Sequence, residues 1–199
     1  MLLVKKELQV DKIIYGEGSA EVLKVQVRIQ GERKRDFAIV YVPPKTNSWR
    51  NEEYGNMLNG TRKYLQRLNE NSKNRTVMGD FNFKEIVLED MTTEGGETSW
   101  GQILLNLAVD IILTQWVKDI TRYRANEEPS RLDLVLTKEP EILGNLEYKS
   151  PLSKSNHVLL EFRLKEGLEE IRNENYEDIR YNYNKTNFAE LRKYFEQID

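Results

Sequence analysis

Three short polar clusters, each beside an apolar run, contain the residues that could carry out chemistry. The first is Gly-Asp-Phe-Asn at residues 79–82, which follows the short predicted strand Thr-Val-Met at residues 76–78. The second is Ser-Arg-Leu-Asp-Leu-Val-Leu-Thr at residues 130–137, in which Asp133 is a charged residue inside an otherwise apolar strand. The third is Ser-Asn-His at residues 155–157, which ends with the single histidine of the chain, His157. Carboxylate, amide and imidazole groups of this kind can bind metal ions or act in acid–base catalysis.

The first cluster has two interpretations. A Gly-Asp-x-Asn sequence is typical of a turn, because Asp and Asn side chains hydrogen-bond to their own backbone. At the end of a strand, the same Asp80 and Asn82 could orient a water molecule or bind a metal ion.

Asp133 and His157 also have two interpretations each. A carboxylate in an apolar strand is costly unless it is paired, and a salt bridge to an arginine would pair Asp133. The alternative is that Asp133 holds an imidazole in one tautomer. His157 could be an ordinary surface or core histidine, or it could face a phosphate group.

Composition limits the class of protein. The 199 residues include 39% apolar and 32% charged residues, which is typical of one globular domain. Cysteine is absent, which excludes disulfides and Cys nucleophiles and favours a cytoplasmic or nuclear location. One histidine excludes metal sites built on two histidines. No apolar run approaches ~18 residues, so we expect no transmembrane helix.

The charge pattern gives little sign of a nucleic-acid-binding surface. The formal net charge is −3, from 30 basic and 33 acidic residues. The one basic-rich stretch, residues 28–35, is interpreted as a solvated hairpin tip. The charge balance therefore argues mildly against tight nonspecific binding to DNA.

The elements that must position the clusters alternate between strands and helices. Alternating or continuous apolar residues predict strands at 23–29, 37–42, 76–78, 132–137 and 158–164. A 3.6-residue period predicts a helix from about 52 to 69, and a capping box of Ser99 and Gln102 predicts another reaching about residue 108. Residues 111–116 fit either a helix end or a strand. This order predicts an α/β or α+β layered domain.

The last 35 residues differ in composition from the rest. Residues 165–185 are polar and acidic, and we interpret them as a linker. Phe188, Leu191, Phe195 and Ile198 then form the apolar stripe of a short amphipathic helix. That stripe needs a surface to pack on, either in this domain or in a following one.

Taken together and in this order, the motifs resemble those of the endonuclease/exonuclease/phosphatase family. The closer resemblance is to the endonuclease domain of non-LTR retrotransposon polyproteins. The matching segments are residues 37–44, 79–82, 130–137 and 155–158. Residues 183–192 resemble the segment that links such an endonuclease to its reverse transcriptase.

The resemblance implies a fold for residues 1–164 and a role for residues 165–199. The family fold is a four-layered sandwich of two packed mixed β-sheets flanked by helices. Residues 3–6 resemble one of its middle strands, so we expect the first strands of the family fold to be missing. Residues 165–199 would then connect the domain to a downstream reverse transcriptase.

The resemblance also implies a reaction, the Mg²⁺-dependent hydrolysis of a DNA phosphodiester by an activated water. Asp80 would orient or deprotonate that water, and Asn82 would help to position it. His157 would contact the scissile phosphate while Asp133 holds its imidazole, and Tyr41 would lie beside the phosphate.

Two departures from the family pattern imply weak metal binding. By the resemblance, Asp80 and Asn156 occupy metal-ligand positions. The family has aspartate where this chain has Asn156. The metal-binding glutamate of the family would lie upstream of residue 1. We therefore expect weak Mg²⁺ binding and low activity. One alternative is an inactive remnant or interaction module; another is the same fold acting on RNA or on a small phosphoester.

Overall fold

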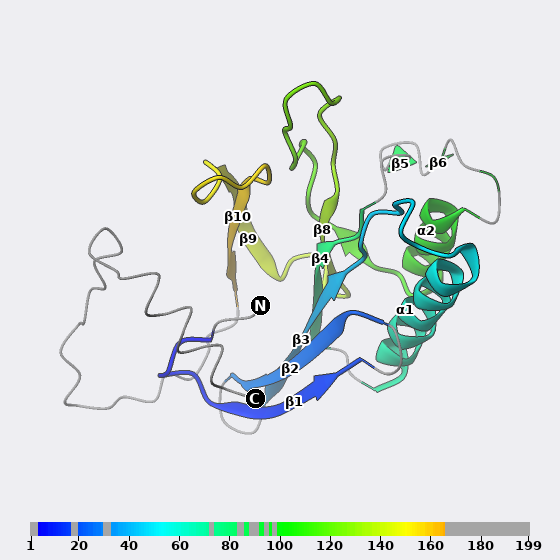
Figure 1. The fold of residues 1–199 in the computed structure, drawn as a ribbon. Coiled ribbons are helices and arrows are strands. Elements are labelled where there is room, and N and C mark those ends of the chain that lie inside the picture. Colours follow the sequence, from blue (N-terminus) through cyan, green and yellow to red (C-terminus); the bar gives the residue numbers. More distant parts are fainter. Residues whose placement is uncertain are drawn as a thin grey trace, which may run out of the picture.

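The computed structural model describes residues 4–16, 20–29, 33–71, 74–82, 86–87, 92–93, 96 and 99–165. These residues form a mixed α/β fold in which two helices cover one face of a six-stranded sheet (Figure 1). A separate pair of strands covers part of the other face. Within these residues, no helix is long and apolar enough to cross a bilayer.

The main sheet contains one parallel pair of strands at its centre. Its order is β1 (Val10–Tyr15), β2 (Val22–Arg28), β3 (Lys34–Tyr41), β4 (Arg75–Asp80), β8 (Asp133–Thr137) and β7 (Thr114–Gln115). Only β3 and β4 run parallel within this sheet, and the other neighbouring strands are antiparallel. The parallel pair requires a crossover, which the first helix supplies.

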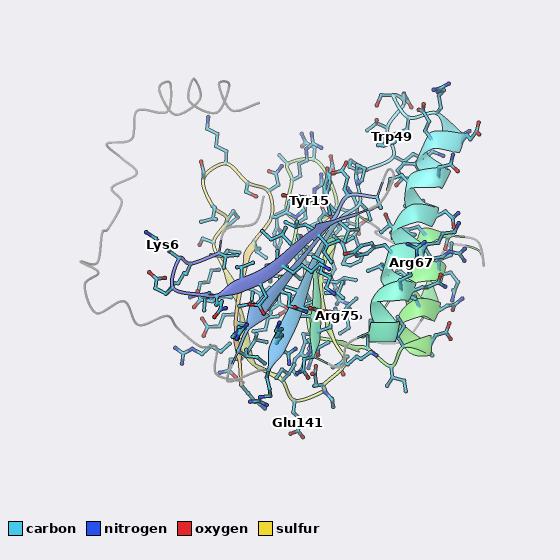
Figure 2. The ribbon with its side chains drawn as sticks, turned by 90° about the horizontal axis from the view of Figure 1, so that it is seen from below. Lys6, Tyr15, Trp49, Arg67, Arg75 and Glu141 are labelled. Atoms are coloured by element: carbon cyan, nitrogen blue, oxygen red, sulfur yellow. The ribbon has the colours of Figure 1, made fainter. Side chains whose placement is uncertain are left out.

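Both predicted helices are confirmed, and they lie side by side on one face of the sheet (Figure 2). They are α1 (Asn51–Asn71) and α2 (Trp100–Asp110). The Ser99 hydroxyl caps α2 by accepting a hydrogen bond from the Gln102 backbone N–H at 3.2 Å. The core beneath the helices includes Val40, Met57, Leu65, Val77, Leu104 and Leu134.

The opposite face of the sheet packs against an antiparallel pair, β9 (Leu143–Lys149) and β10 (Leu159–Leu164). Strand alternation divides β8 between the two sides. Leu134 and Leu136 join the core under the helices, whereas Val135 joins the core under β9 and β10. A third small pair is β5 (Ile86–Val87) with β6 (Thr92–Thr93). The described residues thus form three layers, and the fourth layer stays a prediction.

One expectation about strands was wrong, and one open alternative is now decided. Residues 4–6 lie outside any strand, and the first strand is instead Val10–Tyr15. The pairing of β1 with β2 shifts register between Val10 and Lys12, and such a bulge breaks the two-residue period by which strands are recognised. Residues 111–116, left open between helix and strand, contain the short strand β7.

The interpretation of residues 28–35 as a solvated hairpin tip was wrong for Arg35. This side chain is fully buried, with Nη2 3.2 Å from Glu139 Oε1 and Nη1 3.4 Å from Thr76 Oγ1. The reason is that β3 begins at Lys34, so Arg35 is already part of the sheet and pairs with Val27 of β2. The carboxylate of Glu139 compensates its charge.

Gly79 is required where β3 and β4 approach each other. Its φ is 143°, and a Cβ at this position would lie 1.9 Å from the carbonyl oxygen of its pairing partner, Val40. Glycine therefore allows the parallel strands to pair immediately before Asp80.

We predict that Gly79→Ala destabilises the protein by at least about 3 kcal/mol, because both the backbone angle and the close contact oppose a side chain. Urea unfolding followed by circular dichroism measures this loss. Gly55→Ala is the matched control, since nothing lies within 4 Å of a Cβ there. Gly55 lies inside α1, as its fifth residue, so we expect that change to stabilise the protein by about 0.5–1 kcal/mol. Equal effects of the two substitutions would contradict the role given to Gly79.

Candidate active site

The ends of three neighbouring strands bring the predicted site residues to one edge of the main sheet. Parallel pairing of β3 with β4 places Tyr41 opposite Asp80. Antiparallel pairing of β4 with β8 places Asp133 opposite Asp80 from the other side. The C-terminal ends of β3 and β4 thus meet the N-terminal end of β8, which is the geometry that gathers residues distant in sequence.

Asp80 ends β4, and a sharp turn follows it. Its Oδ1 accepts a hydrogen bond from the Asn82 backbone N–H at 2.9 Å, and Asn82 has a φ of 46°, which asparagine tolerates. Between them, Phe81 is fully buried and anchors the turn. Its N–H donates to the Leu132 carbonyl at 2.9 Å, and its carbonyl accepts from the Trp100 indole at 3.2 Å. The turn interpretation of this cluster is therefore confirmed, and the turn lies at the end of a strand. That Asp80 and Asn82 orient a water molecule or bind a metal ion stays a prediction.

His157 is the partner of Asp133. The two atoms His157 Nδ1 and Asp133 Oδ2 lie 2.8 Å apart, and the other ring nitrogen, Nε2, lies 4.0 Å from Asp80 Oδ2. The side chains of all three residues are partly buried. This pairing decides between the two alternatives for Asp133, in favour of an imidazole over an arginine. A carboxylate bonded to Nδ1 directs Nε2 outward and fixes the ring.

A short segment that the sequence did not single out joins His157 to β8. The Thr121 hydroxyl accepts hydrogen bonds from the backbone N–H groups of Leu132 and Asp133, at 3.0 and 3.1 Å. The Thr121 carbonyl accepts from the Val158 N–H at 2.8 Å. Thr121 is fully buried, and these bonds hold the two sides of the Asp133–His157 pair together. Nothing in its sequence context, an irregular stretch with no hydrophobic period, signals that role.

The strongest electrostatic effect in the site acts on Asp80. Burial, and secondarily the negative charge of Asp133, raise the pKa of Asp80 from 3.8 to about 6. The Asn82 N–H and the positive charges of His157 and Arg122 act in the opposite direction but do not cancel the rise. The Asp80 carboxylate is consequently poorly stabilised when it is ionised.

This arrangement fits a hard divalent cation. Asp80, Asp133 and His157 each offer a ligand atom, and these atoms lie within 4.8 Å of one another. Asp133 Oδ2 already contacts the imidazole, so Asp80 is the carboxylate best placed to meet a cation. A bound cation would also supply the charge that this buried carboxylate lacks.

Tyr41 and Asn156 lie at the margins of this group. Tyr41 ends β3 beside Asp80 and is 42% exposed; burial, and then the charges of Asp80 and Glu21, raise the pKa of its phenol. Asn156 is exposed, and its backbone carbonyl accepts a hydrogen bond from the Tyr123 N–H at 2.8 Å. The structure thus brings together Asp80, Asn82, Asp133 and His157 and sets Tyr41 next to them. The metal-binding role of Asn156 stays a prediction.

Solved structures with similar folds include an endonuclease domain and a 3′ phosphatase. The endonuclease domain of TRAS1, a telomere-specific non-LTR retrotransposon, shares 17% identity with a TM-score of 0.55, covering 78% of this chain and 67% of that one. A 3′ phosphatase, NExo from Neisseria, bound to a product DNA hairpin, shares 11% identity with a TM-score of 0.57, covering 79% and 72%. At these identities the likeness shows the fold alone.

Sequence comparison assigns the family. No curated protein matches this chain. The family model described as endonuclease-reverse transcriptase matches residues 36–161, which is more than half of the chain and includes every cluster of the site. The chain therefore belongs to the endonuclease-reverse transcriptase family, within the endonuclease/exonuclease/phosphatase proteins.

Proposed function

We propose that this chain is a Mg²⁺-dependent phosphodiester hydrolase that nicks DNA, as in retrotransposition, with low activity. The observation that carries the proposal is the Asp133–His157 pair, whose free ring nitrogen lies 4.0 Å from the buried carboxylate of Asp80. Support comes from family membership and from the fold shared with the TRAS1 endonuclease domain and with DNA-bound NExo.

Each residue then has a defined role. Asp133 accepts a hydrogen bond from the His157 Nδ1–H, so that Nε2 faces the scissile phosphate. Asp80 accepts a proton from the attacking water or orients it, and its raised pKa suits a group that exchanges protons near neutral pH. Asn82 and Tyr41 position the water and the phosphate from the two sides of Asp80.

Metal binding would be weak because the site offers few free carboxylates. Asp80 and Asn156 would hold the ion, and Asn156 is neutral where the family pattern has aspartate. When bound, Mg²⁺ supplies positive charge to the phosphate oxygens during hydrolysis. Asp133 is already paired with His157, so it contributes little further charge to the ion.

The two segments of the chain would have different roles. Residues 1–164 would be the four-layered endonuclease domain, and residues 165–199 would connect it to a reverse transcriptase. The DNA substrate places its action inside the cell, in the nucleus or the cytoplasm.

Plasmid nicking tests the proposal. We expect slow, Mg²⁺-dependent conversion of supercoiled to open-circular DNA, reduced on the order of 100-fold or more by His157→Ala or Asp80→Ala. Asp119→Asn, an exposed change outside the site, should leave the rate unchanged.

Three results would revise the proposal. Nicking that survives Asp80→Ala would remove the assigned roles. No nicking by the wild type at any Mg²⁺ concentration would favour an inactive remnant. Cleavage of RNA or of a small phosphodiester, but not of DNA, would favour the third alternative.

A charge change at residue 156 tests whether Asn156 occupies a metal-ligand position. Asn156→Asp restores a negative charge beside His157 and should lower the Mg²⁺ concentration that gives half-maximal nicking, by about tenfold. Asn145→Asp adds the same charge at an exposed position on β9 and should leave that concentration unchanged. Equal responses of the two variants would show that Asn156 is not a ligand position.

A third prediction follows from the pKa of Asp80. In the folded protein Asp80 keeps its proton up to about pH 6, whereas in the unfolded chain it releases the proton near pH 3.8. The free energy of unfolding therefore falls as the pH rises from 3.8 to about 6. The Asp80→Asn substitution removes the ionisable group and, with it, this loss of folding stability. In EDTA at about pH 7.5 we expect the variant to be more stable by about 1–3 kcal/mol, with the gain vanishing near pH 4.

Urea unfolding across that pH range measures the effect, and Asp119→Asn serves as the exposed control. A loss of stability in Asp80→Asn at pH 7.5 would show that the Asp80 carboxylate is not under electrostatic stress.

A further inference from the structure

The segment between β7 and β8 brings a charged residue, Arg122, next to His157. The Arg122 backbone N–H donates to the Ser130 carbonyl at 2.9 Å, and the neighbouring Tyr123 N–H donates to the Asn156 carbonyl at 2.8 Å. Arg122 therefore pairs antiparallel with Ser130 on one side and with His157 on the other. Residues directly opposite each other in antiparallel pairing project to the same face, with Cβ atoms about 5 Å apart. The side chains of Arg122 and His157 thus share one face beside the candidate site.

The guanidinium of Arg122 shares its carboxylate partner with a second arginine. The Arg122 side chain is 13% exposed, and its Nη1 lies 2.8 Å from Glu127 Oε2. The other oxygen of this carboxylate, Oε1, lies 2.9 Å from Nη1 of Arg124, whose side chain is 56% exposed. Two guanidinium groups and one carboxylate leave these three residues with one net positive charge. This group therefore favours a further anion, and a phosphate matches the planar fork of donors on a guanidinium.

The positive charge of Arg122 acts on the candidate site itself. Burial and the negative charge of Asp133 raise the pKa of Asp80, whereas the charges of His157 and Arg122 act against this rise. Coulombic attraction weakens with distance, so a guanidinium that acts on the Asp80 carboxylate also acts on an anion bound beside it.

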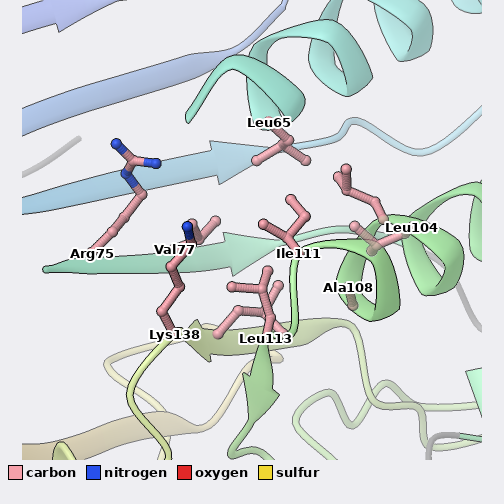
Figure 3. A pocket seen from close by; sticks show the side chains of 10 residues that line it. Leu65, Arg75, Val77, Leu104, Ala108, Ile111, Leu113 and Lys138 are labelled. Atoms are coloured by element: carbon pink, nitrogen blue, oxygen red, sulfur yellow. The ribbon is translucent and has the colours of Figure 1, made fainter. Parts of the chain in front are cut away.

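Arg75, another arginine with a carboxylate partner, lies away from this site. It begins β4, whereas Asp80 ends that strand, and its Nη2 lies 3.3 Å from Asp36 Oδ2. Figure 3 shows Arg75 at one end of an apolar pocket. Arg75 thus belongs to the interior of the protein, whereas Arg122 is placed to meet an anion beside His157.

We propose that Arg122 and His157 together bind the phosphate of the substrate, so that the phosphate is held even without a metal ion. The inference rests on the proposed function for the identity of the substrate, a phosphodiester. Arg122 donates hydrogen bonds to the phosphate oxygens, and His157 donates one from Nε2 when its ring is charged. Glu127 holds the guanidinium in the free protein, and the phosphate competes with it. This contact gives the phosphate positive charge that a weakly bound Mg²⁺ supplies only in part.

Phosphate binding in EDTA tests the inference in the full chain without requiring hydrolysis. Because His157 is the single histidine, its imidazole gives one set of NMR signals, and their shifts on addition of inorganic phosphate measure the dissociation constant. We expect a saturable shift in the wild type. Arg122→Gln should raise the dissociation constant by about tenfold or more, because a charged hydrogen-bond donor is lost. Arg124→Gln removes the same charge from the same carboxylate partner, but at an exposed position, and should change the constant by less than about twofold.

A second pair of variants leaves Arg122 in place and decides the question if Arg122→Gln fails to fold. Glu127→Gln removes the carboxylate that competes with phosphate and should lower the dissociation constant by about threefold or more. Glu128→Gln removes the same charge from the next, exposed residue and should leave the constant unchanged.

Three results would overturn the inference: equal effects of the two arginine variants, equal effects of the two glutamate variants, or no saturable shift in the wild type. A wild type that binds phosphate through Arg122 but nicks no DNA would support the phosphate site and overturn the proposed function alone.

Discussion

The hydrogen bond between His157 Nδ1 and Asp133 Oδ2 is the interaction on which the candidate site depends. It joins β8 to His157, two residues before β10, and so it connects the main sheet with the small strand pair on its other face. The buried Thr121 reinforces the connection by bonding to the backbone on both sides. Without this bond, the imidazole would lose its defined tautomer and its direction toward Asp80.

Asp80 shows that the site is arranged for chemistry at the expense of stability. A carboxylate at the end of a buried strand, opposite a second carboxylate, is unfavourable when it is ionised, and the pKa of about 6 expresses that cost. A structural carboxylate in the same sheet, by contrast, has cationic partners that compensate its charge. Asp36 is also buried, but Lys24 Nζ at 2.7 Å and Arg75 Nη2 at 3.3 Å compensate its charge. An uncompensated carboxylate next to an oriented histidine is characteristic of a functional site.

The two ends of the main sheet therefore carry different kinds of polar group. At one end, strand termini present Tyr41, Asp80 and Asp133 around a partly exposed imidazole. At the other end, the buried Arg35 and Arg75 are paired with Glu139 and Asp36. The close approach of β3 and β4 at Gly79 lies at the first of these ends, immediately before Asp80.

The sequence by itself determined the helices α1 and α2 and the strands β2, β3, β4, β8 and β10, and it singled out the four polar residues Asp80, Asn82, Asp133 and His157. These features depend on local patterns: hydrophobic period, a Ser99 cap, and motifs that follow strands. It did not determine that Arg35 is buried or that β1 begins at Val10, because a partner 104 residues away and a bulge leave no periodic trace. The sequence also left open whether Asp133 pairs with an arginine in a salt bridge or with an imidazole. Only the tertiary structure decided that, since the choice rests on the antiparallel register of β4 with β8 and on Thr121 holding His157 in place.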